Sequence, residues 1–131
     1  MVITGASGFI GSAFATAVQA RGARIVALVE PGADDCNLEG IDAERAVADI
    51  QDIAAVRAAC AGARFVFHLA AVYCFWARDP RIFYDVNVGG TLNVLTAARA
   101  AGWPCPHVAA GRRAVIRALA DRSAVPVWPL G

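Results

Sequence analysis

Three glycines near the start of the chain carry its clearest chemical signal. Gly5, Gly8 and Gly11 follow a short apolar run and precede an amphipathic helical pattern, which is the layout of a dinucleotide pyrophosphate site. In such a site the first glycine permits a tight turn, the second lets the backbone approach the pyrophosphate, and the third lets the helix pack close to its strand. The helix then offers free N–H groups to the anion. Glycine-rich loops also form simple turns in proteins that bind no nucleotide. The surrounding strands and helices must therefore show which interpretation applies.

Two carboxylates stand where acidic residues meet adenosine in such sites. Glu30 lies 19 positions beyond Gly11, close to the spacing of roughly 20 at which an acid binds the ribose hydroxyls. A carboxylate there favours NAD and repels the extra phosphate of NADP, although a solvated loop acid is the alternative. Asp49 and Ile50 follow an expected strand and would place a carboxylate and an apolar side chain at the adenine. Asp49 is equally well interpreted as the cap of a helix beginning near Gln51.

The elements that must position these residues alternate between strand and helix. Apolar runs predict strands at residues 2–3, 24–29, 46–48 and 64–69. Helical patterns are expected at residues 12–20, 53–60 and 79–101, the first ended by Gly22 and the last begun by Asp79-Pro80. This alternation predicts an α/β fold with a parallel, doubly wound sheet of about four strands.

With these residues in place the chain resembles the extended short-chain dehydrogenase/reductase family of NAD-dependent epimerases, dehydratases and reductases. Four motifs carry the resemblance: the glycine fingerprint, Asp49-Ile50, His68-Leu69-Ala70-Ala71 and Asn87-Val88-Gly89-Gly90-Thr91. The chain is more narrowly similar to hopanoid-associated sugar epimerases and dihydroflavonol-reductase-like proteins. Three segments carry this similarity: Leu28-Val29-Glu30-Pro31, Asn37-Leu38-Glu39-Gly40 and Tyr73-Cys74-Phe75-Trp76-Ala77-Arg78-Asp79-Pro80. Such relatives often carry an arginine after the second strand, so Glu30 argues against an inherited NADP preference.

The resemblance implies a Rossmann-like sheet in the order third-second-first-fourth, NAD as cofactor with NADP as the alternative, and hydride transfer on a nucleotide sugar or related alcohol. The backbone of residues 69–71 should line the crevice beside the first strand. Asn87 would hold a backbone group or a water near the active centre, or merely sit on a helix face. The cofactor-binding residues implied are Gly5, Ser7, Gly8, Phe9, Ile10, Gly11, Glu30, Asp49, Ile50, Leu69, Ala70, Ala71 and Asn87.

Other candidate residues have structural explanations. His68 is a lone strand histidine, which is more often packed and hydrogen-bonded than catalytic, and the resemblance supports that view. The aromatic cluster of Tyr73, Phe75 and Trp76 would either face substrate in a complete protein or simply pack.

The residues for catalysis in this family are missing. The resemblance covers residues 1–102, after which the family supplies a fifth strand, a Tyr-x-x-x-Lys helix and a substrate domain. In the family that tyrosine exchanges a proton with the substrate hydroxyl. This sequence contains no lysine, and Tyr73 and Tyr84 are followed four residues later by Ala77 and Val88. We therefore assign no catalytic residue and expect no activity from the chain alone.

The remaining residues, 103–131, are interpreted as an out-of-family tail without the substrate domain. Pro104 and Pro106 cannot both donate to a central strand ladder. A frameshift, a degraded gene or a sequencing error would explain the tail, and a divergent tail with its own role is the alternative.

Composition favours a cytoplasmic protein with no membrane span and no nucleic-acid partner. The net charge is +1, which attracts nucleic acid little, and no apolar run approaches the roughly 20 residues of a spanning helix. No targeting segment is evident. The four cysteines, Cys36, Cys60, Cys74 and Cys105, lack Cys-x-x-Cys spacing, so we expect reduced thiols and no metal site.

Three functions remain open: the amino-terminal part of an NAD-dependent enzyme, a module that binds NAD without turnover, and a nonfunctional fragment. In the implied sheet order the fourth strand lies at an edge. Its apolar run Phe65-Val66-Phe67 predicts self-association through that edge.

Overall fold

Strands and helices alternate along residues 1–101, the part of the chain that the computed structural model describes. The interpretation of residues 103–131 as an out-of-family tail lies outside the described residues. The strands are β1 (Val2–Thr4), β2 (Ile25–Val29), β3 (Ala43–Val47) and β4 (Val66–His68). The helices are α1 (Phe9–Gln19), a 3-10 helix (Cys36–Leu38), α2 (Ile53–Cys60), α3 (Arg81–Tyr84), a π-helical segment (Asp85–Gly90) and α4 (Thr91–Ala100).

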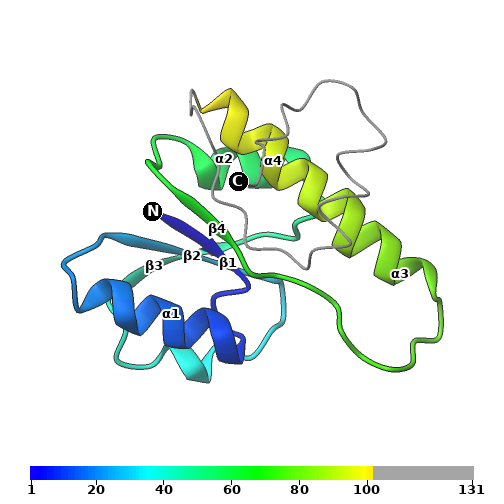
Figure 1. Ribbon diagram of the computed structural model, residues 1–131, viewed down its shortest axis with the longest axis horizontal. Coiled ribbons are helices and arrows are strands. Elements are labelled where there is room, and N and C mark those ends of the chain that lie inside the picture. The colour runs from blue at the N-terminus through cyan, green and yellow to red at the C-terminus, as the bar shows by residue number, and fades with distance from the viewer. Residues whose placement is uncertain (102–131) are drawn as a thin grey trace, which may run out of the picture.

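The four strands form one parallel sheet in the order β3-β2-β1-β4, which confirms the predicted architecture. The centre of the sheet is β1, whose Ile3 is paired with Ala27 on one side and Phe67 on the other. Helix α1 covers one face, and α2 and α4 pack together on the opposite face (Figure 1). The chain therefore forms three layers, and the carboxyl ends of all four strands lie at one edge of the sheet.

The central strands are apolar on both faces because each face is covered by helices. Val2 and Leu28 belong to the core cluster that contains Val56 of α2 and Val94 of α4. Their chain neighbours point the other way, into the cluster that contains Ala15 of α1. An uninterrupted apolar run cannot by itself be distinguished from a buried helix. In this chain the runs of β1 and β2 are explained by burial of these strands in the middle layer.

Two predicted boundaries were wrong. Strand β3 begins at Ala43, three residues before its expected start, because Glu44 and Arg45 are exposed on an edge strand and interrupt the apolar pattern. Helix α1 begins at Phe9, three residues early, because extended Gly8 is its N-cap. The last residues of the glycine fingerprint are therefore the first turn of the helix.

The expected helix over residues 79–101 is a continuous helical run from Arg81 to Ala100 that contains the π-helical segment. Such segments arise where the ladder of helical hydrogen bonds is locally widened, frequently at functional sites. Val88 and Gly90 of this segment are buried, so the run turns this side toward the sheet.

Substitutions at the two adjacent glycines of this segment should have opposite effects. A Cβ at Gly90 would lie 2.6 Å from both Cγ1 and Cδ1 of Ile50, whereas a Cβ at Gly89 would meet no atom of another element in residues 1–101 within 4 Å. We expect Gly90→Ala to lower the free energy of unfolding by about 1–2 kcal/mol through overpacking. Gly89→Ala should raise it by up to about 1 kcal/mol through helix propensity. Urea denaturation of both variants measures the difference, and equal stability would contradict it.

Self-association through β4 stays a prediction. Among the described residues β4 pairs only with β1, and Phe65 beside it is 39% exposed. Although the strand is only 3 residues long and short edge strands reduce edge-to-edge pairing, the exposed apolar side chain of Phe65 favours it. We expect dimers or larger species in size-exclusion chromatography with light scattering, and a sharp monomer peak at tens of micromolar would contradict the prediction.

Candidate functional site

The glycine loop joins β1 to α1 by close backbone contacts. Gly5 adopts a φ of +65°, and a Cβ there would lie 2.7 Å from the backbone N and Cα of Ala70. The Gly8 N–H donates to the Gly5 carbonyl at 3.1 Å, which closes the turn. A Cβ at Gly11 would lie 2.0 Å from the Gly5 carbonyl oxygen. Gly5 and Gly11 are therefore required by packing within the protein itself.

Gly8 is different, because it faces outward. It is exposed, its φ is −70°, and among residues 1–101 a Cβ there would meet only the Gly5 carbonyl oxygen, at 3.3 Å. Gly8 is therefore not required by packing among the described residues in the way that Gly5 and Gly11 are. The α1 N-terminus beside it has no side-chain cap and no acidic residue in its first turn. These features suit the backbone approach of an anion to a helix N-terminus.

The segment after β4 lies against the glycine loop. The Leu69 N–H donates to the Thr4 carbonyl and to Thr4 Oγ1, both at 3.2 Å, and the Ala70 N–H donates to Thr4 Oγ1 at 3.2 Å. Ala71 follows and is exposed. One threonine at the end of β1 therefore fixes the backbone turn after β4.

His68 is packed and hydrogen-bonded, as predicted. It is fully buried, with Nδ1 at 2.6 Å from Thr4 Oγ1 and Nε2 at 2.9 Å from Thr91 Oγ1. The Thr91 hydroxyl donates to the Asn87 carbonyl at 2.6 Å, so it accepts from Nε2–H. Nδ1 then accepts from the Thr4 hydroxyl, and the imidazole is neutral. Burial lowers the pKa of His68 to about 4, which agrees with this neutral state.

Removing the Thr4 hydroxyl should be costly because it has three partners. Thr4→Val keeps the side-chain shape but leaves His68 Nδ1 and the Ala70 N–H without their partner. We expect the free energy of unfolding to fall by about 2 kcal/mol. Thr16→Val is the control, because the Thr16 hydroxyl is exposed and donates only to the Ser12 carbonyl; its effect should stay within about 0.5 kcal/mol. Thermal and urea denaturation of both variants provide the comparison, and equal losses would refute the assignment.

Asn87 holds a backbone group, one of the two alternatives that the sequence left open. Its Oδ1 accepts from the Val72 N–H at 2.8 Å, and its Nδ2 donates to the Val72 carbonyl at 2.8 Å. The π-helical segment carries this side chain to the loop after β4. The segment of residues 69–72 is therefore hydrogen-bonded at both ends, by Thr4 at Leu69 and Ala70 and by Asn87 at Val72.

The predicted adenosine residues follow the carboxyl ends of β2 and β3. Glu30 comes directly after β2 and is exposed. The Asp49 carboxylate accepts from the Gln51 N–H at 2.8 Å, but the alternative that it caps α2 is wrong. The cap is Asp52, which accepts from the Ala54 and Ala55 N–H groups. Ile50 is 6% exposed and belongs to the core.

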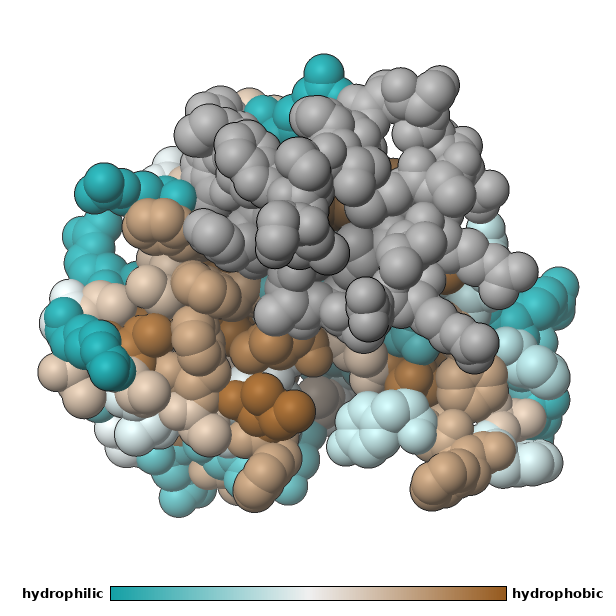
Figure 2. Space-filling model, in the orientation of Figure 1, coloured by the Kyte–Doolittle hydropathy of each residue, from teal (hydrophilic) through white to brown (hydrophobic). Residues whose placement is uncertain are grey.

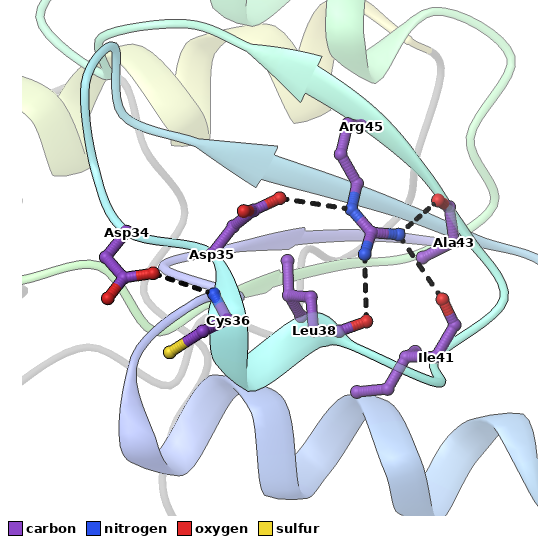
Figure 3. Close-up of polar contacts among 7 residues, drawn as sticks. All are labelled: Asp34, Asp35, Cys36, Leu38, Ile41, Ala43 and Arg45. Carbon is purple, nitrogen blue, oxygen red and sulfur yellow. Dashed lines mark hydrogen bonds and ion pairs between the residues drawn. The ribbon is translucent and has the colours of Figure 1, made fainter.

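Two residues of this edge were missed by sequence reasoning. The Asn37 amide donates to the Ser7 carbonyl at 2.8 Å, across 30 positions of the chain. The Arg45 guanidinium donates to the carbonyls of Leu38 at 2.8 Å, Ala43 at 2.7 Å and Ile41 at 3.3 Å, and forms an ion pair with Asp35 (Figure 3). An Asn in a turn and an Arg on an edge strand are common surface residues, so no sequence signal marked these roles.

Large hydrophobic side chains are exposed in two segments near this edge. The first turn of α1 exposes Phe9 and Ile10, and the segment before α3 exposes Tyr73, Phe75 and Trp76. Figure 2 shows hydrophobic side chains gathered on the face over α1. The alternative that the three aromatics simply pack is therefore wrong.

Within residues 1–101 no group of three or more His, Cys, Asp or Glu side chains is placed to hold a metal ion. In the same part of the chain no helix is long and apolar enough to cross a membrane. Cys36, Cys60 and Cys74 are free thiols, and burial raises the pKa of the Cys60 thiol.

Comparison with known proteins identifies the family. The model of the NAD dependent epimerase/dehydratase family matches residues 1–116. Sterol demethylase protein B of Methylococcus capsulatus is 35% identical over 101 residues, which cover 77% of this chain and 31% of the relative. A putative dihydroflavonol 4-reductase of Synechocystis is 32% identical over 100 residues, covering 76% of this chain and 29% of the relative. The chain thus spans less than a third of the length of these two relatives.

A solved structure shows the same arrangement. The UDP-glucose 4-epimerase of Thermus thermophilus, in complex with NAD, is 28% identical and superposes with a TM-score of 0.68 over 77% of this chain and 34% of the epimerase. The sheet of this chain resembles the amino-terminal Rossmann part of such dehydrogenase/reductase structures. The chain belongs to the NAD dependent epimerase/dehydratase family.

Proposed function

We propose that the chain binds NAD at the carboxyl ends of its strands, with the pyrophosphate at the N-terminus of α1. The observation that carries the proposal is the exposed surface at Gly8, beside a helix N-terminus with no side-chain cap and no acidic residue in its first turn. Backbone N–H groups and the helix dipole would stabilise the pyrophosphate charge there. The epimerase with the similar fold is an NAD complex, which supports the choice of ligand.

The other contacts follow from the strand ends. Glu30 would accept hydrogen bonds from the adenosine ribose hydroxyls, which favours NAD over NADP. Asp49 and Ile50 would lie at the adenine. Ser7, Phe9 and Ile10 would complete the pyrophosphate loop.

The remaining predicted residues lie on the other side of the glycine loop. The backbone of residues 69–71 would line the crevice beside Gly5, where the Ala70 backbone already lies. Asn87 would act through the Val72 backbone that it holds.

Calorimetric titration of the purified chain with NAD and with NADP tests this proposal. The blocking variant is Gly8→Val, because Gly8 is exposed, a Cβ there approaches the Gly5 carbonyl oxygen no closer than 3.3 Å, and the side chain would occupy the space that the pyrophosphate needs. Ala17→Val, at an exposed position of the same helix, is the matched control. We expect saturable NAD binding that Gly8→Val abolishes and Ala17→Val keeps, with weaker NADP binding. A folded chain that binds neither nucleotide would refute the proposal.

The reaction we propose for the complete protein is hydride transfer on a nucleotide sugar or related alcohol. When bound, NAD supplies the hydride acceptor, and this chain's residues orient it and exclude water. Tyr73, Phe75 and Trp76 are exposed and would face substrate there. The names of the relatives include a UDP-glucose epimerase and a dihydroflavonol reductase, which supports the reaction class and leaves both substrate types as candidates.

A second candidate is a module that binds NAD without turnover. It is favoured by the absence of lysine from the sequence, and by Ala77 and Val88 at the positions where a Tyr-x-x-x-Lys motif would need lysine. Without the proton transfer that this motif provides, the rate falls by roughly a hundred- to ten-thousandfold. We expect neither a change in NADH absorbance nor any conversion of the sugar, followed by NMR, when the chain is incubated with NAD and UDP-sugars. Turnover above that of the Gly8→Val variant would exclude this second candidate.

A further inference from the structure

The loop after β2 is fixed to the protein at two points, Leu38 and Arg45, to which the sequence alone assigned no role. Leu38 is fully buried in the core cluster under α1. Arg45, on β3, donates to the carbonyls of Leu38, Ile41 and Ala43. As Figure 3 shows, a single guanidinium therefore gathers the carbonyls on both sides of the turn before β3. A surface loop with these two anchors can hold a third residue in a fixed place.

That third residue is Asn37. Its Nδ2 donates to the Ser7 carbonyl at 2.8 Å, while the N–H of the same peptide group, on Gly8, donates to the Gly5 carbonyl at 3.1 Å. Both polar atoms of the Ser7–Gly8 peptide are thus bonded, and its plane cannot rotate without breaking both bonds. The next peptide begins α1, so its orientation depends on this one.

The consequence for an anion is electrostatic. If the Ser7–Gly8 peptide turned over, its carbonyl oxygen would point toward the Gly5 carbonyl oxygen, which now accepts from the Gly8 N–H. Two negative centres in contact repel, so the loop would be displaced from the position in which the start of α1 meets the anion. Asn37 Nδ2 donates to the Ser7 carbonyl and holds that carbonyl toward the loop after β2. The N–H groups at the start of α1 then remain available for the anion.

We propose that Asn37 is a positioning residue that fixes the phosphate-binding loop through the Ser7 carbonyl and joins it to the loop that begins at Glu30. The glycine loop at the pyrophosphate and the loop after β2 at the ribose would then form one preorganised unit, and Arg45 would stabilise the second of these loops. Preorganisation raises affinity because less ordering is needed at binding. The affinity part of this inference rests on the proposed NAD binding, whereas the ordering part does not.

Asn37→Ala tests both parts, with Gln19→Ala as the matched control. Gln19 Oε1 accepts from the Asp42 N–H at 2.6 Å, so it ties the same loop to the far end of the same helix. Each variant loses one side-chain to backbone hydrogen bond, but only one of them touches the glycine loop. Asn37→Asp is a second variant that keeps the shape and replaces the donor by an oxygen, so its loss should equal or exceed that of Asn37→Ala.

Hydrogen–deuterium exchange of the ligand-free chain is the first measurement. We expect faster exchange of residues 5–12 in Asn37→Ala than in the unchanged protein or Gln19→Ala, with residues 53–60 unaffected. NAD titration is the second, and we expect about five- to tenfold weaker binding for Asn37→Ala and unchanged binding for Gln19→Ala. Unchanged exchange in Asn37→Ala, or an equal loss of affinity in Gln19→Ala, would overturn the inference. Failure of the unchanged protein to bind NAD would refute the proposed function, and the exchange result would still decide the role of Asn37.

Discussion

Gly11→Ala is expected to lower the free energy of unfolding by about 3 kcal/mol and to abolish NAD binding. The added Cβ would lie 2.0 Å from the Gly5 carbonyl oxygen, and 2.8 Å from both the Gly5 carbonyl carbon and Ala6 Cα. All three atoms are backbone, so no side chain can swing aside, and either the loop or the helix must move. Helix propensity alone favours alanine by up to about 1 kcal/mol, which is too little to offset the clash. Urea denaturation and calorimetric titration measure the two effects.

Gly8→Ala is the control for this substitution, three residues away in the same motif. Its Cβ would lie 3.3 Å from the same carbonyl oxygen, and its φ of −70° suits any residue. The loss of stability should stay below about 1 kcal/mol, the typical effect of an N-cap change. Equal stability of the two variants would show that the close approach of α1 to the Gly5 carbonyl is not what requires glycine at position 11.

The central strand β2 followed from the sequence, whereas the order of the sheet was an implication of the family resemblance that the structure confirms. Residues 25–29 are apolar without interruption, and between two expected helices such a short run favours a strand buried on both faces of a parallel sheet. The edge strand β3 was misplaced because Glu44 and Arg45 lie at exposed positions, where the side chains carry no pattern. The π-helical segment was not predicted either, since Val88 and Gly90 fit an ordinary helix as well as a widened one.

In the candidate site, too, the motif residues could be predicted from the sequence, whereas the side chains that hold them in place could not. The fingerprint predicted why Gly5 and Gly11 must be glycines, because close approach of backbones is a property of the residue type. It said nothing of Thr4, which fixes the turn after β4, or of Asn37, which holds the Ser7 carbonyl. Such side chains act across more than 20 positions of the chain, and their partners become visible only when the fold brings them together.

The second large effect is a loss of stability in acid that comes from His68. Its pKa is about 4 in the folded chain, against an ordinary value of 6.5, because the buried imidazole is kept neutral. Between these two values the unfolded chain binds a proton that the folded chain does not, so stability rises with pH. The contribution is complete above pH 6.5 and is lost as the pH falls toward 4. A difference of this size corresponds to about 3 kcal/mol.

Urea denaturation between pH 7.5 and pH 4 measures this dependence, with His68→Asn as the variant that cannot titrate. We expect the unchanged protein to lose about 3 kcal/mol more than the variant over that range. A charged imidazole would donate from both nitrogens. Thr4 Oγ1, which has two lone pairs, would then face three donors at once, from His68, Leu69 and Ala70. The turn that lines the proposed NAD crevice should therefore loosen as His68 is protonated, so NAD affinity should fall over the same pH range. A pKa near 6.5 for the folded His68, measured by NMR, would contradict the whole argument, because the network would then tolerate the charged ring.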